Sequence, residues 1–199
     1  ESAKGVFAIA AVVNHFSDAV VRNDRFFYYH LQKGLAHRQL RQWDQARSEL
    51  ENSVQLLPTA DAYYALGTLA EQRGERSAAL EHYSRAAQSQ SPTGQAAQDA
   101  TVRLEIPTAP GKYLAARGVL DGNNQLIVEL GNPTRVAVAD VLITVRYADS
   151  QGAIRELNRR FNGELPPGQS TRWATGLGPF TSTAAFQVTV DGARAIGAN

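Results

Sequence analysis

Cysteine and methionine are both absent from this 199-residue chain, and neither sign of charge dominates. Without cysteine the protein has no disulfide, no thiolate nucleophile and no sulfur-ligated metal. Without methionine, Glu1 is not a translational start, so we expect the chain to come from a longer parent protein. A formal net charge of +1, from 20 basic and 19 acidic residues, provides no field to attract nucleic acid or an anionic membrane, and neither is an expected partner.

Long apolar runs are also missing. The most apolar run near the start, "GVFAIAAVV" at 5–13, is far shorter than the roughly 20 residues of a membrane span, and His15 and Asp18 follow it. We therefore predict a buried helix face here and no membrane insertion by this segment.

Motifs that carry chemistry are absent as well. The chain has no HExxH, no GxSxG, no GxxxxGK[ST] and no GxGxxG after a strand. His30 and His37 share a helix face but lie about 10 Å apart along the axis, which is too far for two zinc ligands, and His15 and His82 have no partner at ligand spacing. We predict no catalytic residue, no metal, no cofactor and no enzymatic activity for this chain.

What the chain does contain is an internal repeat. The stretches "KGLAHRQLRQWDQARSEL" and "LGTLAEQRGERSAALEHY" align at an offset of 67 − 34 = 33, which matches Gly34, Ala46 and Leu50 with Gly67, Ala79 and Tyr83. Apolar spacing predicts helices over 27–40, 43–56, 60–73 and 77–88. Glycine in mid-helix costs up to about 1 kcal/mol, so its recurrence at Gly34 and Gly67 predicts close helix crossings.

These residues resemble the tetratricopeptide repeat. The second copy carries Tyr63, Leu66, Gly67, Ala79, Tyr83, Ala86 and Pro92, and the first carries Leu31, Gly34, Ala46, Leu50, Ser53 and Pro58. Three departures are Lys33, where the family usually has leucine, Arg41, where the second copy has Gly74, and a spacing one residue short of the usual repeat. Val12, Phe16 and Ala19 fit the second helix of a preceding half repeat, and "TGQAAQDATVRL" fits a closing helix.

Beyond "IPTAPGK" the periodicity changes to that of strands. "DVLITVRYAD" and "AFQVTVDG" alternate apolar and polar residues, and turn signals separate about six such runs. We therefore predict an α+β protein of two domains: a tetratricopeptide-type helical solenoid over 1–104, a linker over 105–112, and an antiparallel immunoglobulin- or fibronectin-like β-sandwich over 113–199.

The resemblance implies a groove lined by the first helix of each repeat. The matching positions are Tyr28, Leu31, Gln32, Leu35, Arg38, Asp61, Tyr64, Thr68 and Glu71. Aromatic, aliphatic and arginine side chains are typical anchors of peptide recognition, so we expect a noncatalytic interaction scaffold that binds a protein or peptide. The other interpretation is that these residues pack against the sandwich or the upstream part of the parent protein. The lysine and asparagine pair of carboxylate-clamping family members is missing.

The helical half is also similar to the repeat region of bacterial envelope zinc metalloproteases, the group that includes the β-barrel assembly-enhancing protease. This resemblance implies a periplasmic or envelope setting, and an alternative function as a substrate-handling region whose catalytic domain lies upstream.

A basic cluster, "RELNRR" at 155–160, lies in the β half. In a strand, Arg155 and Arg159 share one face and Arg160 lies on the other. A solvated strand and a patch for phosphate or an acidic partner are both compatible with this pattern.

Overall fold

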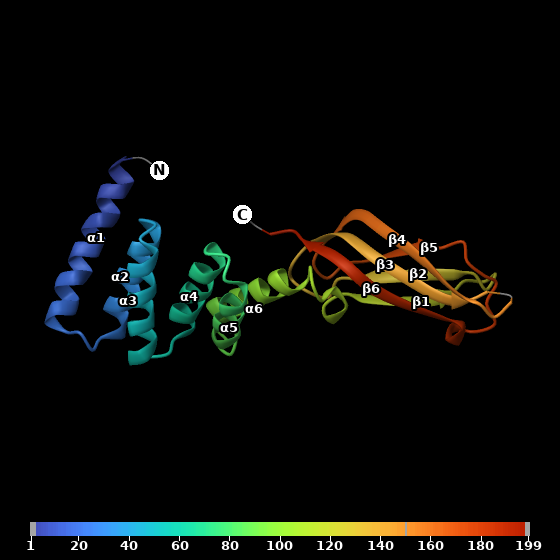
Figure 1. Cartoon of the computed structure of the whole chain (residues 1–199), viewed down its shortest axis with the longest axis horizontal. Helices are drawn as coiled ribbons and strands as arrows, with labels where there is room; N and C mark the ends of the chain where they lie inside the picture. Colours follow the sequence, from blue (N-terminus) through green and yellow to red (C-terminus); the bar gives the residue numbers. More distant parts are fainter. Residues whose placement is uncertain (1–2, 150, 198–199) are drawn as a thin grey trace. The chain divides into compact units, whose positions relative to one another are not determined.

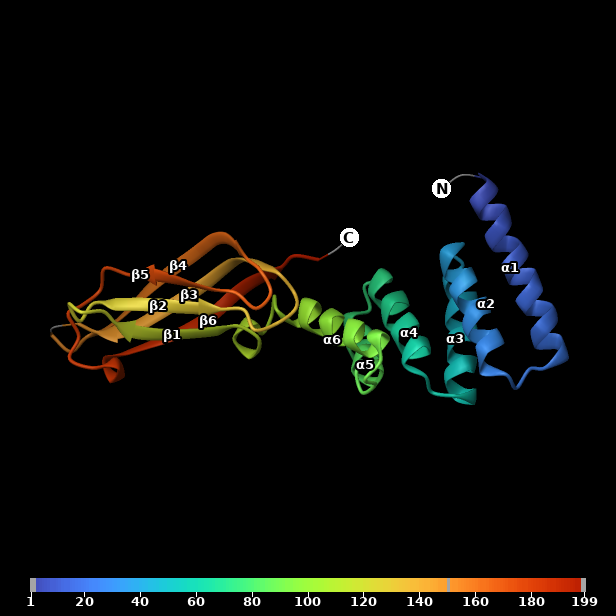
Figure 2. The ribbon, with the colours of Figure 1, turned by 180° about the vertical axis from the view of Figure 1, so that it is seen from behind.

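The structure is a computed structural model that describes residues 3–149 and 151–197. The chain divides into two compact units, Glu1–Thr101 and Val102–Asn199. The first is built of helices and the second of two antiparallel sheets (Figures 1 and 2), so the protein is of the α+β class.

The helical unit is a series of helices in which sequence neighbours pack as pairs. The bounds are α1 (Ala3–Arg22), α2 (Phe27–Gln39), α3 (Trp43–Leu56), α4 (Ala60–Gln72), α5 (Arg76–Ala86) and α6 (Pro92–Glu105). Helix α2 packs on α3 and α4 packs on α5, with α3 against α4 between the pairs. The four helices predicted from the repeat are confirmed, with ends that differ by no more than two residues from those predicted.

The two repeated glycines lie where the helices of a pair come closest, as predicted. A Cβ added at Gly34 would lie 2.8 Å from Cγ of Leu50, and one added at Gly67 would lie 2.6 Å from Cδ1 and Cε1 of Tyr83. Leu50 and Tyr83 are themselves fully buried. Glycine therefore makes room for the large side chain of the second helix of each pair.

The turn within each pair requires a left-handed backbone. Gly74 has φ +74° between α4 and α5, and Arg41 has φ 57° at the same place between α2 and α3. Left-handed backbone costs a residue with a Cβ roughly 1–2 kcal/mol. The departure noted at Arg41 is therefore a strained turn residue.

Helix α1 corrects one prediction. It packs against α2, but the apolar run at 5–13 is not a buried face, because Phe7 is 75% exposed and Val6 and Val12 are more than 40% exposed. Among the described residues, α1 is the one helix that is both long enough and apolar enough to cross a membrane. Its segment Gly5–Arg22 has a mean hydropathy of 1.2. The helix is longer than the apolar run at 5–13, since it continues to Arg22.

The second unit contains the strands β1 (Ala115–Leu120), β2 (Leu126–Gly131), β3 (Val138–Ala148), β4 (Ile154–Leu165), β5 (Ser170–Ala174) and β6 (Phe186–Ala195). All pairings are antiparallel, with strand order β1-β2-β5 in one sheet and β4-β3-β6 in the other. Two short 3₁₀ turns, Pro110–Lys112 and Thr183–Ala185, accompany them. The sheets are not closed into a barrel.

One hydrophobic core joins the two sheets. It contains alternate residues of β2 and β3, among them Leu126, Val128, Val141, Ile143 and Val145. The alternation that predicted these strands thus separates buried from outer side chains.

A buried amide holds one end of this core. Asn132, in the "GNPT" turn, is 1% exposed, and its Nδ2 donates to the carbonyl oxygens of Val136 at 2.9 Å and Leu165 at 3.0 Å. Its Oδ1 accepts hydrogen bonds from the backbone N–H and the hydroxyl of Thr134. The predicted turn is therefore tied to the end of β4.

The stretch 105–112 differs from the expected linker. Ile106 is fully buried in the core of the second unit, and Pro110 is buried as well. Helix α6 also continues past the boundary between the units, which falls after Thr101. The segment was expected to be a linker, but burial of Ile106 makes it part of the second unit.

Candidate functional site

A groove of about 630 Å³ lies along the first helices of the repeats. Helix α2 contributes six of the thirteen lining residues, and α4 with its N-cap residue Thr59 and the start of α6 contribute the rest. The lining residues are Phe27, Tyr28, Leu31, Gln32, Leu35, Arg38, Thr59, Asp61, Tyr64, Ala65, Pro92, Thr93 and Ala96.

Helix pairing explains why this face is left open. The side of α2 with Gly34 packs on α3, and the side of α4 with Gly67 packs on α5. Leu31 and Ala65 form buried floor positions, whereas Tyr28 is 44% exposed and its ring lies 6.2 Å from that of Phe26. The groove thus combines a closed apolar floor with an accessible aromatic side chain.

Two polar side chains in the groove are held by hydrogen bonds. Nη1 of Arg38 donates to Oγ1 of Thr68, which itself donates to the carbonyl of Ala65 at 2.9 Å. Oδ1 of Asp61 accepts from the hydroxyl of Thr93 at 2.5 Å. One positive and one negative group therefore lie at fixed places along an apolar channel.

The structure places most of the predicted groove residues together. Two of them, Thr68 and Glu71, lie outside the lining. Thr68 positions Arg38, and Glu71 accepts a hydrogen bond from the Tyr83 hydroxyl at 2.9 Å, so Glu71 serves the packing of α4 on α5.

The part of the groove formed by α6 was not among the predicted positions. Pro92, Thr93 and Ala96 line it, although the segment was expected only to close the array. The helices that form the groove start at Phe27, Ala60 and Pro92, at intervals of 60 − 27 = 33 and 92 − 60 = 32. Extending the 33-residue period by one step would have identified α6 as a third lining helix.

The Lys33 departure is explained by a half-buried ionic cluster between α2 and α3. Oε1 of Glu49 lies 2.7 Å from Nζ of Lys33, and Oε2 lies 2.7 Å from Nδ1 of His30. Nε2 of His30 lies 2.9 Å from the backbone carbonyl of Asp24. Burial raises the pKa of Glu49, but hydrogen bonds from Lys33 and His30 outweigh it and lower the pKa overall.

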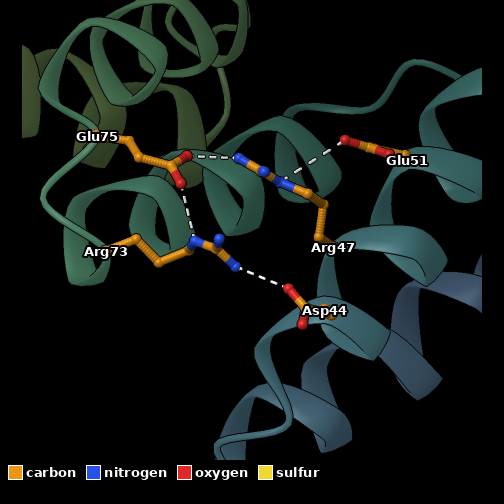
Figure 3. Close-up of polar contacts among 5 residues, drawn as sticks. All are labelled: Asp44, Arg47, Glu51, Arg73 and Glu75. Atoms are coloured by element: carbon orange, nitrogen blue, oxygen red, sulfur yellow. Dashed lines mark hydrogen bonds and ion pairs between the residues drawn. The ribbon is translucent and has the colours of Figure 1, made fainter.

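A second charged network joins successive repeats (Figure 3). Arg73, after α4, donates to Asp44 at 2.9 Å and to Glu75 at 2.8 Å, and Glu75 also accepts from Arg47 on α3. Desolvation raises the pKa of Glu75, but the two arginines outweigh it and lower the pKa. This surface network connects α3 with the turn after α4.

Two of the remaining histidines contact neighbouring side chains. Nδ1 of His37 lies 2.6 Å from Oε1 of Gln42, and the ring of His82 stacks on Tyr63 with a centroid distance of 6.4 Å. In the part of the chain that the structure describes, no three His, Asp or Glu side chains gather in a way that could hold a metal ion.

No protein-family model matches the chain, and no curated protein matches it. Among solved structures it is similar to a thermophilic TPR protein of Thermus thermophilus, with 25% sequence identity and a TM-score of 0.47. The match covers 52% of this chain and 53% of that chain, so the chain spans about half the length of the solved structure it matches. The resemblance to envelope metalloproteases finds no support in these comparisons. The repeat assignment rests on the 33-residue period and the helix packing described above.

Proposed function

We propose that the helical unit is a noncatalytic scaffold of the tetratricopeptide type, whose groove binds a peptide segment of a protein partner. The observation that carries this proposal is the groove itself, with Tyr28, Leu35 and Tyr64 along an apolar floor and two charged groups held in place. Exposed aromatic and aliphatic side chains supply binding energy, and fixed polar groups set the register of a bound segment.

The chemistry of the groove defines the segment it fits. Arg38 favours an acidic group and Asp61 favours a basic group or a hydrogen-bond donor, with apolar anchors between them. The groove is also small enough that a single helix or extended stretch fills it, so the partner contributes a segment.

The second unit has a supporting part in this proposal. Its strand order, β1-β2-β5 facing β4-β3-β6 over one core, favours the immunoglobulin- or fibronectin-like sandwich expected from sequence. We propose that it acts as a spacer or a second docking surface. No contact among the described residues favours a protease-associated region over a scaffold.

A random peptide library displayed on phage, selected against the whole chain, tests the groove. We expect selected peptides to bind Tyr28→Ala and Arg38→Gln about 5–30-fold more weakly than the wild type, which corresponds to the 1–2 kcal/mol of an ordinary anchor residue. Tyr63→Ala is the matched control, because Tyr63 lies on α4 outside the groove lining. Equal binding to Tyr28→Ala and the wild type would show that the groove is not the site.

A further inference from the structure

A second hollow, of about 330 Å³, lies in the β unit between the outer strands β4 and β5. Val128, Leu130 and Ile143 form its apolar floor, and the half-buried rings of Phe161 and Trp173 form its sides. Strands β4 and β5 are edges of different sheets, and the hollow between them lies over apolar side chains that are themselves buried.

Arginine surrounds this apolar interior. Arg159 pairs with Ile143 across β3 and β4, so it shares the inner face of the sheet with Phe161. Its guanidinium carbon lies 5.9 Å from the ring centroid of Trp173 on the opposite sheet. Arg160, Thr171 and Arg172 complete the lining.

The charge of Arg159 and Arg160 is not balanced. Among the described residues, neither has a carboxylate within ion-pair distance. Other arginines of the unit do pair with a carboxylate: Arg117, Arg146, Arg155, Arg172 and Arg194. Two arginines that line the apolar hollow, Arg159 and Arg160, therefore carry positive charge that no nearby carboxylate in the described part of the chain neutralises.

We propose that this hollow binds a small apolar carboxylate, with the hydrocarbon body between Phe161 and Trp173 and the carboxylate on Arg159. Guanidinium groups bind carboxylates through two parallel N–H donors, and an aromatic slot takes an aliphatic chain. The volume lies at the lower end of the roughly 300–1,000 Å³ typical of ligand pockets, which suits a free small molecule better than a peptide strand. This site is independent of the groove in the helical unit.

The two tryptophans of the chain make the test specific, because Trp43 is in the helical unit and Trp173 is in the hollow. The whole chain is labelled with 5-fluorotryptophan and titrated with octanoate below its micelle concentration, with octanol and octylammonium as ligands of other charge. By fluorine NMR we expect octanoate to shift the Trp173 signal saturably and to leave the Trp43 signal in place. Octanol should bind about tenfold more weakly than octanoate, because it lacks one charge-assisted contact with the arginine. Octylammonium should give no saturable shift.

Variants locate the carboxylate. Arg159→Gln should weaken octanoate binding about tenfold, to the level of octanol. Arg155→Gln is the matched control, since Arg155 lies on the same face of β4 but donates to Asp149 at 2.9 Å. A Trp173 signal that does not move, equal affinity for the three ligands, or equal weakening by the two variants would overturn the proposal. In that case Arg159 serves only as an inward-facing charge that protects the edge of the sheet.

Discussion

A single methyl group added at Gly67 tests the close helix crossing on which the repeat depends. The new Cβ would lie 2.6 Å from two ring carbons of Tyr83, well inside van der Waals contact. The ring cannot move away easily, because it is 1% exposed and its hydroxyl donates to Glu71 at 2.9 Å. Overpacking of this kind costs about 1–3 kcal/mol, and alanine gains about 1 kcal/mol of helix propensity over glycine. We therefore expect Gly67→Ala to destabilise the helical unit by about 0–2 kcal/mol.

A second background separates the two opposing effects. In Tyr83→Leu the rigid ring is replaced by the residue type that faces Gly34 in the first repeat, and a leucine can change rotamer. There we expect Gly67→Ala to cost at least ~1 kcal/mol less than with tyrosine, a coupling energy typical of residues in contact. Guanidinium denaturation of a Trp173→Phe protein, followed by Trp43 fluorescence, reports on the helical unit alone.

If Gly67→Ala costs the same free energy of unfolding with tyrosine and with leucine at position 83, the close contact between Gly67 and Tyr83 does not explain the glycine. Equal costs would mean that the glycine is present for a backbone reason rather than for contact. Gly67→Leu provides a coarser check, since it should destabilise by roughly 1–3 kcal/mol and a melt unchanged by it would contradict the crossing.

Three further predictions concern single positions. Arg41→Gly should stabilise the helical unit by up to about 1 kcal/mol and Gly74→Ala should destabilise it by a similar amount, because both residues have positive φ; denaturation midpoints that move the other way would contradict the strained turn. Burial lowers the pKa of His82 below 6.5 and Nδ1 has no hydrogen-bond partner among the described residues, so the unfolded state binds more protons. The stability of the helical unit should then fall as pH drops below 6.5 and level off below the folded pKa, and His82→Phe, which keeps a ring beside Tyr63, should flatten that slope in denaturation at pH 7.5 and 5.5. Asn132→Ala leaves buried carbonyls without a donor and should destabilise the β unit by about 2–3 kcal/mol; a midpoint unchanged when followed by the tryptophan of that unit would show that the amide is dispensable.

The helices and their close crossings could be predicted because both follow from spacing along the chain. The 33-residue offset fixes which positions are equivalent. A glycine that recurs in mid-helix, as at Gly34 and Gly67, indicates a close approach of another helix. The exposure of α1 could not be predicted in the same way. An apolar helix is buried only if another surface covers it, and Phe7 has none among the described residues.

The candidate site was predictable where the repeat fixes the face of a helix and unpredictable where contacts depend on a partner elsewhere in the chain. Tyr28 and Tyr64 line the groove because their helices present the same face in each repeat. The ion pair between Lys33 and Glu49, which lies on the next helix, could not be predicted from spacing. An apolar pair and an ionic pair can occupy the same two positions of the repeat. In the β half, alternation placed Arg159 and Arg160 on opposite faces of one strand. The hollow beside them could not be predicted, because it depends on the distance between the edges of the two sheets.

The cluster of His30, Lys33 and Glu49 bears on how the array avoids pairing its helices wrongly. Thirty-three residues later, the counterparts of Lys33 and Glu49 are Leu66 and His82. If two copies of the chain exchanged helices, so that α2 lay on α5 and α4 lay on α3, the lysine would face a histidine and the carboxylate of Glu49 would face a leucine. A partly buried charge left without its partner is strongly destabilising. Each first helix is thus chemically matched to its own kind of second helix, and we infer that the first repeat disfavours pairing of α2 with α5, or of α4 with α3, during folding.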